Sequence, residues 1–127
     1  MNTTAAALIK IGGFASIGWF AFHCFFWRLF NWKSQLKRLN EVNNGVMQVL
    51  NLCLSFVFLI FAAVSLLYAT ELLDGGLGRA LLAGIGCFWV LRLIEQPLFF
   101  GFSRISNLFS LLFAATAACY LAAWALN

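Results

Sequence analysis

Four long apolar stretches cover most of the chain, at residues 5–30, 46–69, 78–100 and 105–126. An α-helix needs ~20 predominantly apolar residues to cross the ~30 Å hydrocarbon core of a bilayer, so each stretch is long enough to be a span. Hydrophobic residues make up 64% of the 127 residues and charged residues only 9%, whereas soluble domains carry about 25% charged residues. The sequence therefore predicts an all-α membrane protein, a four-transmembrane-helix bundle that forms a single domain over residues 1–127.

The basic residues are distributed unevenly between the two predicted sides of the membrane. One side, formed by the first and third connections between spans, carries five of them: Arg28, Lys33, Lys37, Arg38 and Arg104. The other side carries only Lys10 and Arg79, and two acidic residues lie near Arg79. Because short loops rich in Lys and Arg stay in the cytoplasm, we expect the first and third connections inside and both termini outside.

The first connection has the pattern of a short amphipathic helix. Four apolar residues follow helical spacing: Trp32, Leu36, Leu39 and Val42. The charged residues Lys33, Lys37 and Arg38 occupy other positions, so the segment is predicted to lie in the headgroup layer with its apolar face toward lipid. The residues Trp32, Lys33, Lys37 and Arg38 would then form a membrane surface that attracts anionic headgroups. The alternative is a plain extension of the first span into water. After this segment, residues 43–45 (Asn-Asn-Gly) predict a turn into the second span.

Polar side chains occur inside the predicted spans, all in the half nearer the cytoplasm. They form a candidate ligand or polar cluster: His23, Gln48, Asn51, Arg92, Glu95 and Gln96. Arg92 and Glu95 are three residues apart, so a salt bridge within one helix is feasible. Charged residues within spans usually face the interior of a bundle or a wet cavity. We therefore expect these side chains from three helices to meet at one level of the bilayer.

Small residues and cysteines predict how the helices pack. Gly12 and Ser16 are four residues apart, a spacing that allows a second helix to approach closely. The four cysteines fall one in each span, without a C-x-x-C pair: Cys24, Cys53, Cys87 and Cys119. We interpret them as small packing residues rather than as a redox centre.

Three interpretations of the polar cluster remain open from the residues alone. It could simply cross-link the helices, it could receive a lipid headgroup or a small molecule, or it could carry an ion or a proton through Glu95. A membrane enzyme using His23 and Glu95 as an acid–base pair is a weaker alternative, because the sequence contains no nucleophile, metal or phosphate motif. A haem held by two imidazoles would require His23 from two copies. We therefore expect no enzymatic activity, no catalytic residue, no metal and no cofactor.

Two segments carry a resemblance to known proteins. Residues 23–40 read HCFFWRLFNWKSQLKRLN and are followed by VMQVLN at 46–51, and residues 88–100 read FWVLRLIEQPLFF. Both resemble small four-span proteins of the bacterial inner membrane to which no activity is assigned. The resemblance implies the same fold and location, as a multi-pass protein of the inner (plasma) membrane. The glycine-threonine-phenylalanine-rich pattern of fluoride channels is absent, as is the first-span glutamate of small multidrug transporters.

These observations favour a non-enzymatic accessory subunit or a lipid- or small-molecule-binding bundle. Its expected partners are membrane lipids, a second copy of the chain or a larger membrane complex. Nucleic acid is not expected, because lipid explains the basic face. The alternative function is a small oligomeric channel or proton-coupled transporter that uses Glu95 and Arg92.

Overall fold

The computed structural model describes residues 2–127, and every regular element in this range is helical. The elements in chain order are α1 (Thr3–Cys24), α2 (Phe26–Leu29), α3 (Trp32–Gln35), the 3₁₀ turn η1 (Leu36–Arg38), α4 (Glu41–Leu67), α5 (Ala69–Leu73), α6 (Gly75–Phe100) and α7 (Arg104–Leu126). Four of them, α1, α4, α6 and α7, are long and apolar enough to cross a membrane. The prediction of an all-helical chain with four candidate spans is therefore confirmed.

Two predicted boundaries differ from the structure. Helix α1 ends at Cys24 and not near residue 30, because Phe25 leaves the helical backbone conformation at φ −92° and ψ 3°. Helix α4 begins at Glu41 and not at residue 46, because the side chain of Asn40 accepts a hydrogen bond from the backbone N–H of Asn43 at 2.8 Å. Such an N-cap satisfies one of the backbone donors that a helix start leaves free. The turn predicted at residues 43–45 is therefore wrong, since these residues are helical.

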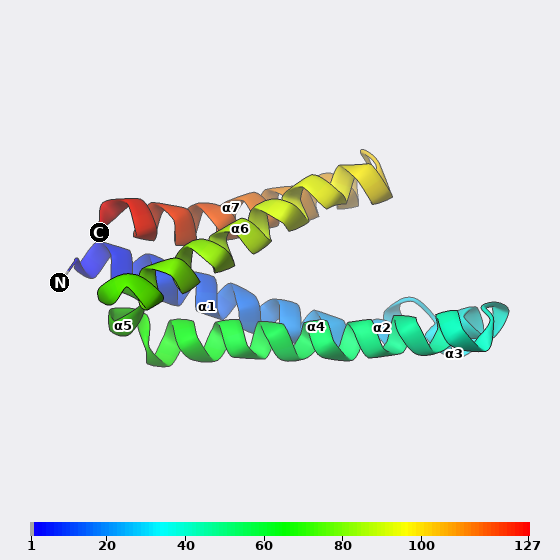
Figure 1. The fold of residues 1–127 in the computed structure, drawn as a ribbon. Helices are drawn as coiled ribbons and strands as arrows, with labels where there is room; N and C mark the ends of the chain where they lie inside the picture. The colour runs from blue at the N-terminus through cyan, green and yellow to red at the C-terminus, as the bar shows by residue number, and fades with distance from the viewer. Residues whose placement is uncertain (1) are drawn as a thin grey trace.

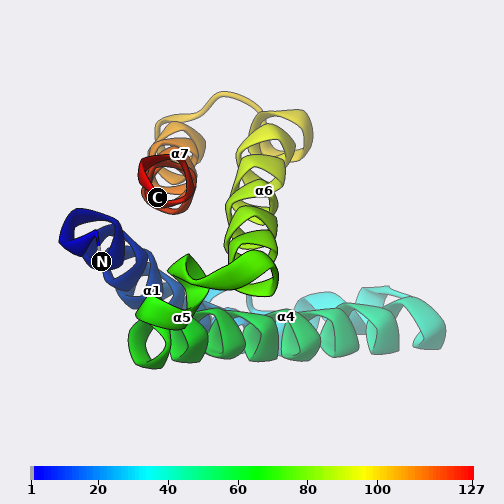
Figure 2. The ribbon, with the colours of Figure 1, turned by 60° about the vertical axis from the view of Figure 1, so that its left-hand side comes forward.

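The long helices form two antiparallel pairs (Figure 1). Helices α1 and α4 make the first hairpin, α6 and α7 make the second, and α1 also packs against α7. The hairpins lie close together at the terminal end, where both chain ends and α5 are found. They diverge toward the loop end, which contains α2, α3, η1 and the turn at residues 101–103 (Figures 1 and 2). The two ends of the molecule therefore differ in how tightly the helices are held.

Four aromatic rings, one from each long helix, join the two hairpins near their middle. We refer to Trp19, Phe58, Trp89 and Phe113 as the aromatic layer. Trp19 stacks on Phe113 at 4.6 Å between ring centroids, and Phe58 stacks on Trp89 at 5.4 Å. Trp89 and Phe113 complete the connection at 5.9 Å. Aromatic pairs contribute about 0.5–1.5 kcal/mol each beyond the area they bury, so this layer stabilises the contact between the hairpins.

Nearer the terminal end, small residues let three helices approach closely. Gly12 and Ser16 of α1 are buried as predicted. A Cβ atom on Gly12 would come within 2.5 Å of the Tyr120 ring, so any side chain there would require the ring to shift. The Tyr120 hydroxyl lies 2.8 Å from that of Ser65, which joins α7 to α4. Three of the cysteines are exposed on the protein surface instead of packed inside it, contrary to our interpretation: Cys24, Cys53 and Cys87.

The connection between α4 and α6 contains the short helix α5. Three of its five residues are buried: Ala69, Leu72 and Leu73. The chain enters α6 through Gly75, whose φ of +73° is strained for any residue with a side chain. The terminal end is therefore closed by a packed element.

Candidate functional site

The interior polar residues are arranged as separate pairs, of which His23 and Asn51 form one. The side-chain N–H of Asn51 donates to the backbone carbonyl of His23 at 3.3 Å, and the Asn51 carbonyl oxygen lies 2.9 Å from Nδ1 of the imidazole. A backbone carbonyl can only accept, which fixes the orientation of the amide. Nδ1 must therefore carry a proton and donate it to Asn51. The other ring nitrogen, Nε2, is left with a lone pair in the neutral imidazole.

This pair also fixes how α1 and α4 are offset along their axes. His23 lies in the last turn of α1, whereas Asn51 lies ten residues after Glu41, about 15 Å along α4 at 1.5 Å per residue. Helix α4 therefore extends well beyond the end of α1. The short segments α2, α3 and η1 lie beside this extension (Figure 1). His23 is thus next to the last residue of α1, whereas the predicted span to residue 30 places it seven residues before the end of the helix.

Arg92 and Glu95 form the second pair, within α6. The guanidinium donates to the carboxylate three residues further on, which confirms the feasible salt bridge. The Arg92 guanidinium carbon also lies 4.9 Å from the centroid of the Phe113 ring, a cation–π contact with the aromatic layer. The two side chains are 23% and 32% exposed. An ion pair is therefore held, mostly covered by protein, within a candidate membrane span.

The two glutamines of the predicted cluster form hydrogen bonds with residues outside that cluster. Gln96 donates to the hydroxyl of Ser106 at 3.3 Å, between α6 and α7. Gln48 donates to the side-chain oxygen of Asn44 at 2.6 Å, along α4. Within residues 2–127, no hydrogen bond joins the His23 pair to the Arg92 pair. The predicted residues thus lie as separate pairs on the two hairpins.

The membrane-surface segment folds differently from the prediction. Trp32 and Leu36 are only 8% and 6% exposed, so protein covers most of each side chain, whereas Leu39 and Val42 are 40% and 73% exposed. Trp32 contacts the rings of Phe26 at 5.6 Å and Trp27 at 5.0 Å. The reason is Asn31, whose left-handed backbone conformation (φ 48°, ψ 46°) turns the chain between α2 and α3.

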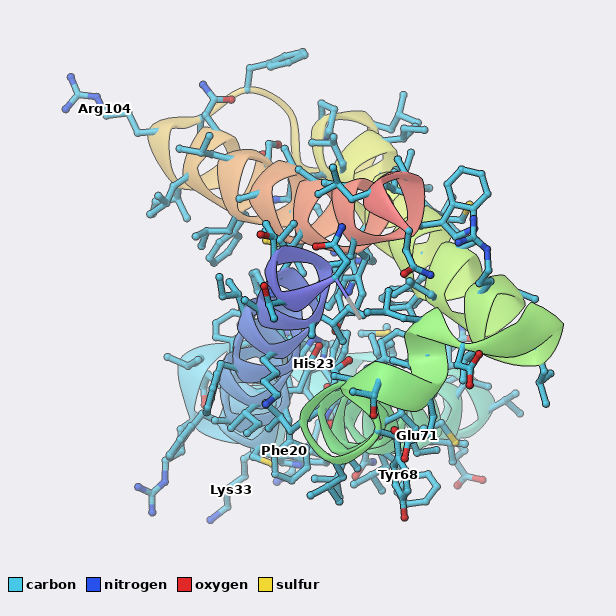
Figure 3. All side chains as sticks on the ribbon, turned by 90° about the vertical axis from the view of Figure 1, so that its left-hand side faces the viewer. Phe20, His23, Lys33, Tyr68, Glu71 and Arg104 are labelled. Carbon is cyan, nitrogen blue, oxygen red and sulfur yellow. The ribbon has the colours of Figure 1, made fainter. Side chains whose placement is uncertain are left out.

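This folding creates an open pocket of about 470 Å³ at the loop end. We refer to it as the loop-end pocket, and it is lined by Trp27, Arg28, Trp32, Lys33, Leu36, Lys37, Asn44 and Gln48. Arg38 does not line it. Figure 3 shows the Lys33 side chain reaching outward from the ribbon, Arg104 doing the same on the second hairpin, and His23 lying among the helices. Trp27, Arg28 and Asn44 line this pocket but are not among the site residues predicted from the sequence, where Arg28 counts only toward the basic side of the membrane.

The terminal end offers less chemistry. A smaller pocket of about 270 Å³ is lined by Thr70, Leu73, Asp74 and Asn127. The Thr70 hydroxyl donates to the Glu71 carboxylate at 2.7 Å, and this hydrogen bond holds the pKa of Glu71 below its ordinary value. Among the residues that the structure describes, no three His, Cys, Asp or Glu side chains gather as a metal site.

Comparison with known protein families, with curated proteins and with solved structures finds no match to this chain. The class of this protein is therefore inferred from its fold alone. An all-helical chain with four helices long and apolar enough to cross a bilayer is a multi-pass membrane protein.

Proposed function

We propose that this chain is a non-enzymatic protein of the bacterial inner membrane that binds a lipid or a small amphiphilic molecule in the loop-end half of its helix bundle. The proposal includes an accessory role, as a homo-oligomer or as a subunit of a larger membrane complex. Membrane lipids are its first expected partners, with anionic headgroups at the Lys33–Arg38 face. No catalytic residue or cofactor is part of the proposal.

One observation carries the proposal: the two hairpins each place a polar pair against the same aromatic layer. The His23 imidazole lies 5.0 Å from the Phe58 ring, and the Arg92 guanidinium lies 4.9 Å from the Phe113 ring. Polar and charged side chains inside a membrane span are expensive and are retained where they bind or transport something. Arg92 offers donors to a phosphate or carboxylate, and Nε2 of His23 offers an acceptor to a hydroxyl. Together they suit the polar end of an amphiphile.

The experiment is to identify what co-purifies with the protein after gentle extraction, by native mass spectrometry. We expect His23→Ala and Arg92→Gln to remain folded and to lose the bound molecule. The matched control is Lys10→Gln, because Lys10 is an exposed cation in the other half of α1. If the two interior variants fold and retain the same molecules as the wild type, the proposal is wrong.

A second candidate function, a small oligomeric channel or proton-coupled transporter, is favoured by Glu95 itself. This carboxylate is 32% exposed within a candidate span and is paired with Arg92. Ionisable residues in such positions form ion and proton paths in transporters. Ion or proton flux into proteoliposomes that is abolished by Glu95→Gln would favour this function over simple binding. Flux that persists in Glu95→Gln would remove Glu95 from the path.

The proposed orientation places the loop end in the cytoplasm and both termini outside. It is supported by the charges, because four basic residues lie in or beside the first connection and Arg104 begins α7 at the same end. Cytoplasmic loops carry such an excess of Lys and Arg. Reporter proteins fused to the C-terminus test it: a periplasm-dependent reporter is expected to be active and a cytoplasm-dependent one inactive.

A further inference from the structure

We propose that the loop-end pocket is a binding site for the phosphate headgroup of a single anionic glycerophospholipid. This inference rests on the proposed function, because it requires the chain to cross a membrane with its loop end at a headgroup layer. It adds a defined ligand and a defined place that do not involve the interior pairs.

The pocket gathers positive charge that no acidic residue neutralises. Arg28, Lys33 and Lys37 all line it, and the only ion pair within residues 2–127 is Arg92–Glu95. Lys33 and Lys37 both line the pocket, so a phosphate group bound there would interact with two ammonium groups. Arg28 adds a planar guanidinium, which can bind two phosphate oxygens at once.

The side-chain amides of Asn44 and Gln48 also line the pocket. Asn44 donates to the backbone carbonyl of Leu36 at 3.0 Å, and Gln48 donates to Asn44 at 2.6 Å. These hydrogen bonds fix which end of each amide faces where. Within residues 2–127, the carbonyl oxygen of Gln48 has no donor. It is therefore free to accept a hydrogen bond from a headgroup hydroxyl, such as those of glycerol.

The remaining wall is apolar and aromatic. Trp27 and Trp32 meet edge to face at 5.0 Å, and Leu36 lies beside them in the lining. Tryptophan is enriched at the boundary between headgroups and acyl chains because its ring is apolar and its N–H is polar. A free phosphate ion has no apolar part that could pack against this wall. A phospholipid has its glycerol and first acyl carbons, which can. The wall therefore favours a lipid over a soluble anion.

The position of the pocket along the helices agrees with this ligand. Helix α4 has 27 residues and is about 40 Å long, some 10 Å more than the hydrocarbon core. With this excess placed at the N-terminal end of α4, beside the basic residues, Asn44 and Gln48 fall at headgroup depth, since they lie three and seven residues after Glu41. The pocket volume of about 470 Å³ falls in the range of small-molecule sites, ~300–1,000 Å³.

The test compares two adjacent cations of equal charge. Lys37 lines the pocket and Arg38 does not, yet both are exposed at the same end of the chain. The purified full-length protein in detergent is titrated with dioleoyl-phosphatidylglycerol or dioleoyl-phosphatidylcholine, and the lipid retained is counted by native mass spectrometry. We expect one phosphatidylglycerol bound in preference to phosphatidylcholine. Lys37→Gln should weaken it about tenfold, as for the loss of one hydrogen bond from a charged donor, and Arg38→Gln less than threefold.

Several results would overturn the inference. Equal weakening by Lys37→Gln and Arg38→Gln would mean a diffuse attraction of the basic face, and equal binding of both lipids would mean no anion site. Displacement of phosphatidylglycerol by millimolar inorganic phosphate would identify a soluble anion as the ligand. Helical content and the thermal unfolding midpoint, measured for every variant, separate lost binding from lost folding.

The outcome is distinguishable from failure of the proposed function. Lys10 lies outside the pocket and outside both interior pairs, so Lys10→Gln is expected to leave phosphatidylglycerol binding unchanged. If Lys37→Gln has no effect while Arg92→Gln still loses its co-purifying molecule, the pocket assignment is wrong and the interior site stands. If the reverse is found, the headgroup site stands and the interior site is wrong.

Discussion

The Asn51 carboxamide bonds to both the ring and the backbone of His23, and so ties the end of α1 to the middle of α4. It accepts from the imidazole at 2.9 Å and donates to the His23 carbonyl at 3.3 Å. Two hydrogen bonds from one amide fix both the offset of the two helices and the imidazole tautomer. The extension of α4 beyond α1, and with it the loop-end pocket, depends on this offset.

We predict that Asn51→Leu destabilises the protein by about 1–2 kcal/mol, because the change keeps the volume but leaves the imidazole N–H without a partner. In a double-mutant cycle with His23→Phe, the coupling energy should lie between about 0.6 and 1.7 kcal/mol, the average and the maximum found for hydrogen bonds between membrane helices. Reversible unfolding in mixed micelles measures both quantities. Strictly additive effects would show that the two side chains do not interact. Nitrogen chemical shifts of His23 provide an independent check and should report a protonated Nδ1.

The sequence was sufficient to predict the four long helices, and the reason is physical. A lipid environment requires continuous apolar runs of span length, and that signal does not depend on how helices pack. The residues at which the helices begin and end were harder to predict from the sequence. Asn40 begins α4 by capping the Asn43 N–H, so residues 43–45, which have the composition of a turn, are held in the helix. A local capping bond therefore overrides the turn preference of these residues.

The site was only partly predictable. The i, i+3 spacing of Arg92 and Glu95 predicts their pair, because both lie on one helix. The pairing of His23 with Asn51 depends on how α1 and α4 are offset along their axes. The spacing of residues within one helix gives no information about this offset. The loop-end pocket depends on the left-handed backbone conformation of Asn31. This conformation affects one residue only, so no periodic pattern in the sequence predicts it. This is why Trp27 was assigned to a span and not to a pocket.

We predict that Gly12→Ala destabilises the terminal half of the protein by about 1–3 kcal/mol, the usual range for overpacking. The added Cβ would lie 2.5 Å from the Tyr120 ring, so the ring must move and weaken its hydroxyl contact with Ser65. The matched control is Gly18→Ala on the same helix, where a Cβ meets nothing within 4 Å. The measurement is the thermal unfolding midpoint of each variant. Equal midpoints for Gly12→Ala and Gly18→Ala would contradict a tight contact at Gly12.

We predict that Thr70→Val raises the pKa of Glu71 toward its ordinary value, because it removes the hydroxyl donor at 2.7 Å. A lowered pKa in the folded state means that this hydrogen bond stabilises the fold above the ordinary carboxyl pKa. The stabilisation is lost as the pH falls through the lowered pKa. Carbon-detected NMR titration of the Glu71 carboxyl measures the shift directly. Thr70→Ser retains a donor and should leave the pKa low, so a rise in both variants would assign the shift to another cause.

The ion pair between Arg92 and Glu95 should respond differently to single and double replacement. Arg92→Met alone leaves a carboxylate without its partner inside a span, and Glu95→Leu alone leaves a guanidinium. Removing one member of a fully buried pair costs about 3–5 kcal/mol, and we expect about 1–3 kcal/mol here because the side chains are 23% and 32% exposed.

Replacing both residues should restore stability to within about 1 kcal/mol of the wild type, since a well-packed apolar pair substitutes for an ion pair at little cost. Unfolding in micelles of the two single variants and the double variant measures this, with Lys10→Gln as the control for loss of an unpaired charge. A double variant less stable than either single variant would mean that each charge is held by other groups. A stable double variant also serves as a functional control. Because it is folded, any loss of ligand binding or flux in it can be assigned to the missing charges.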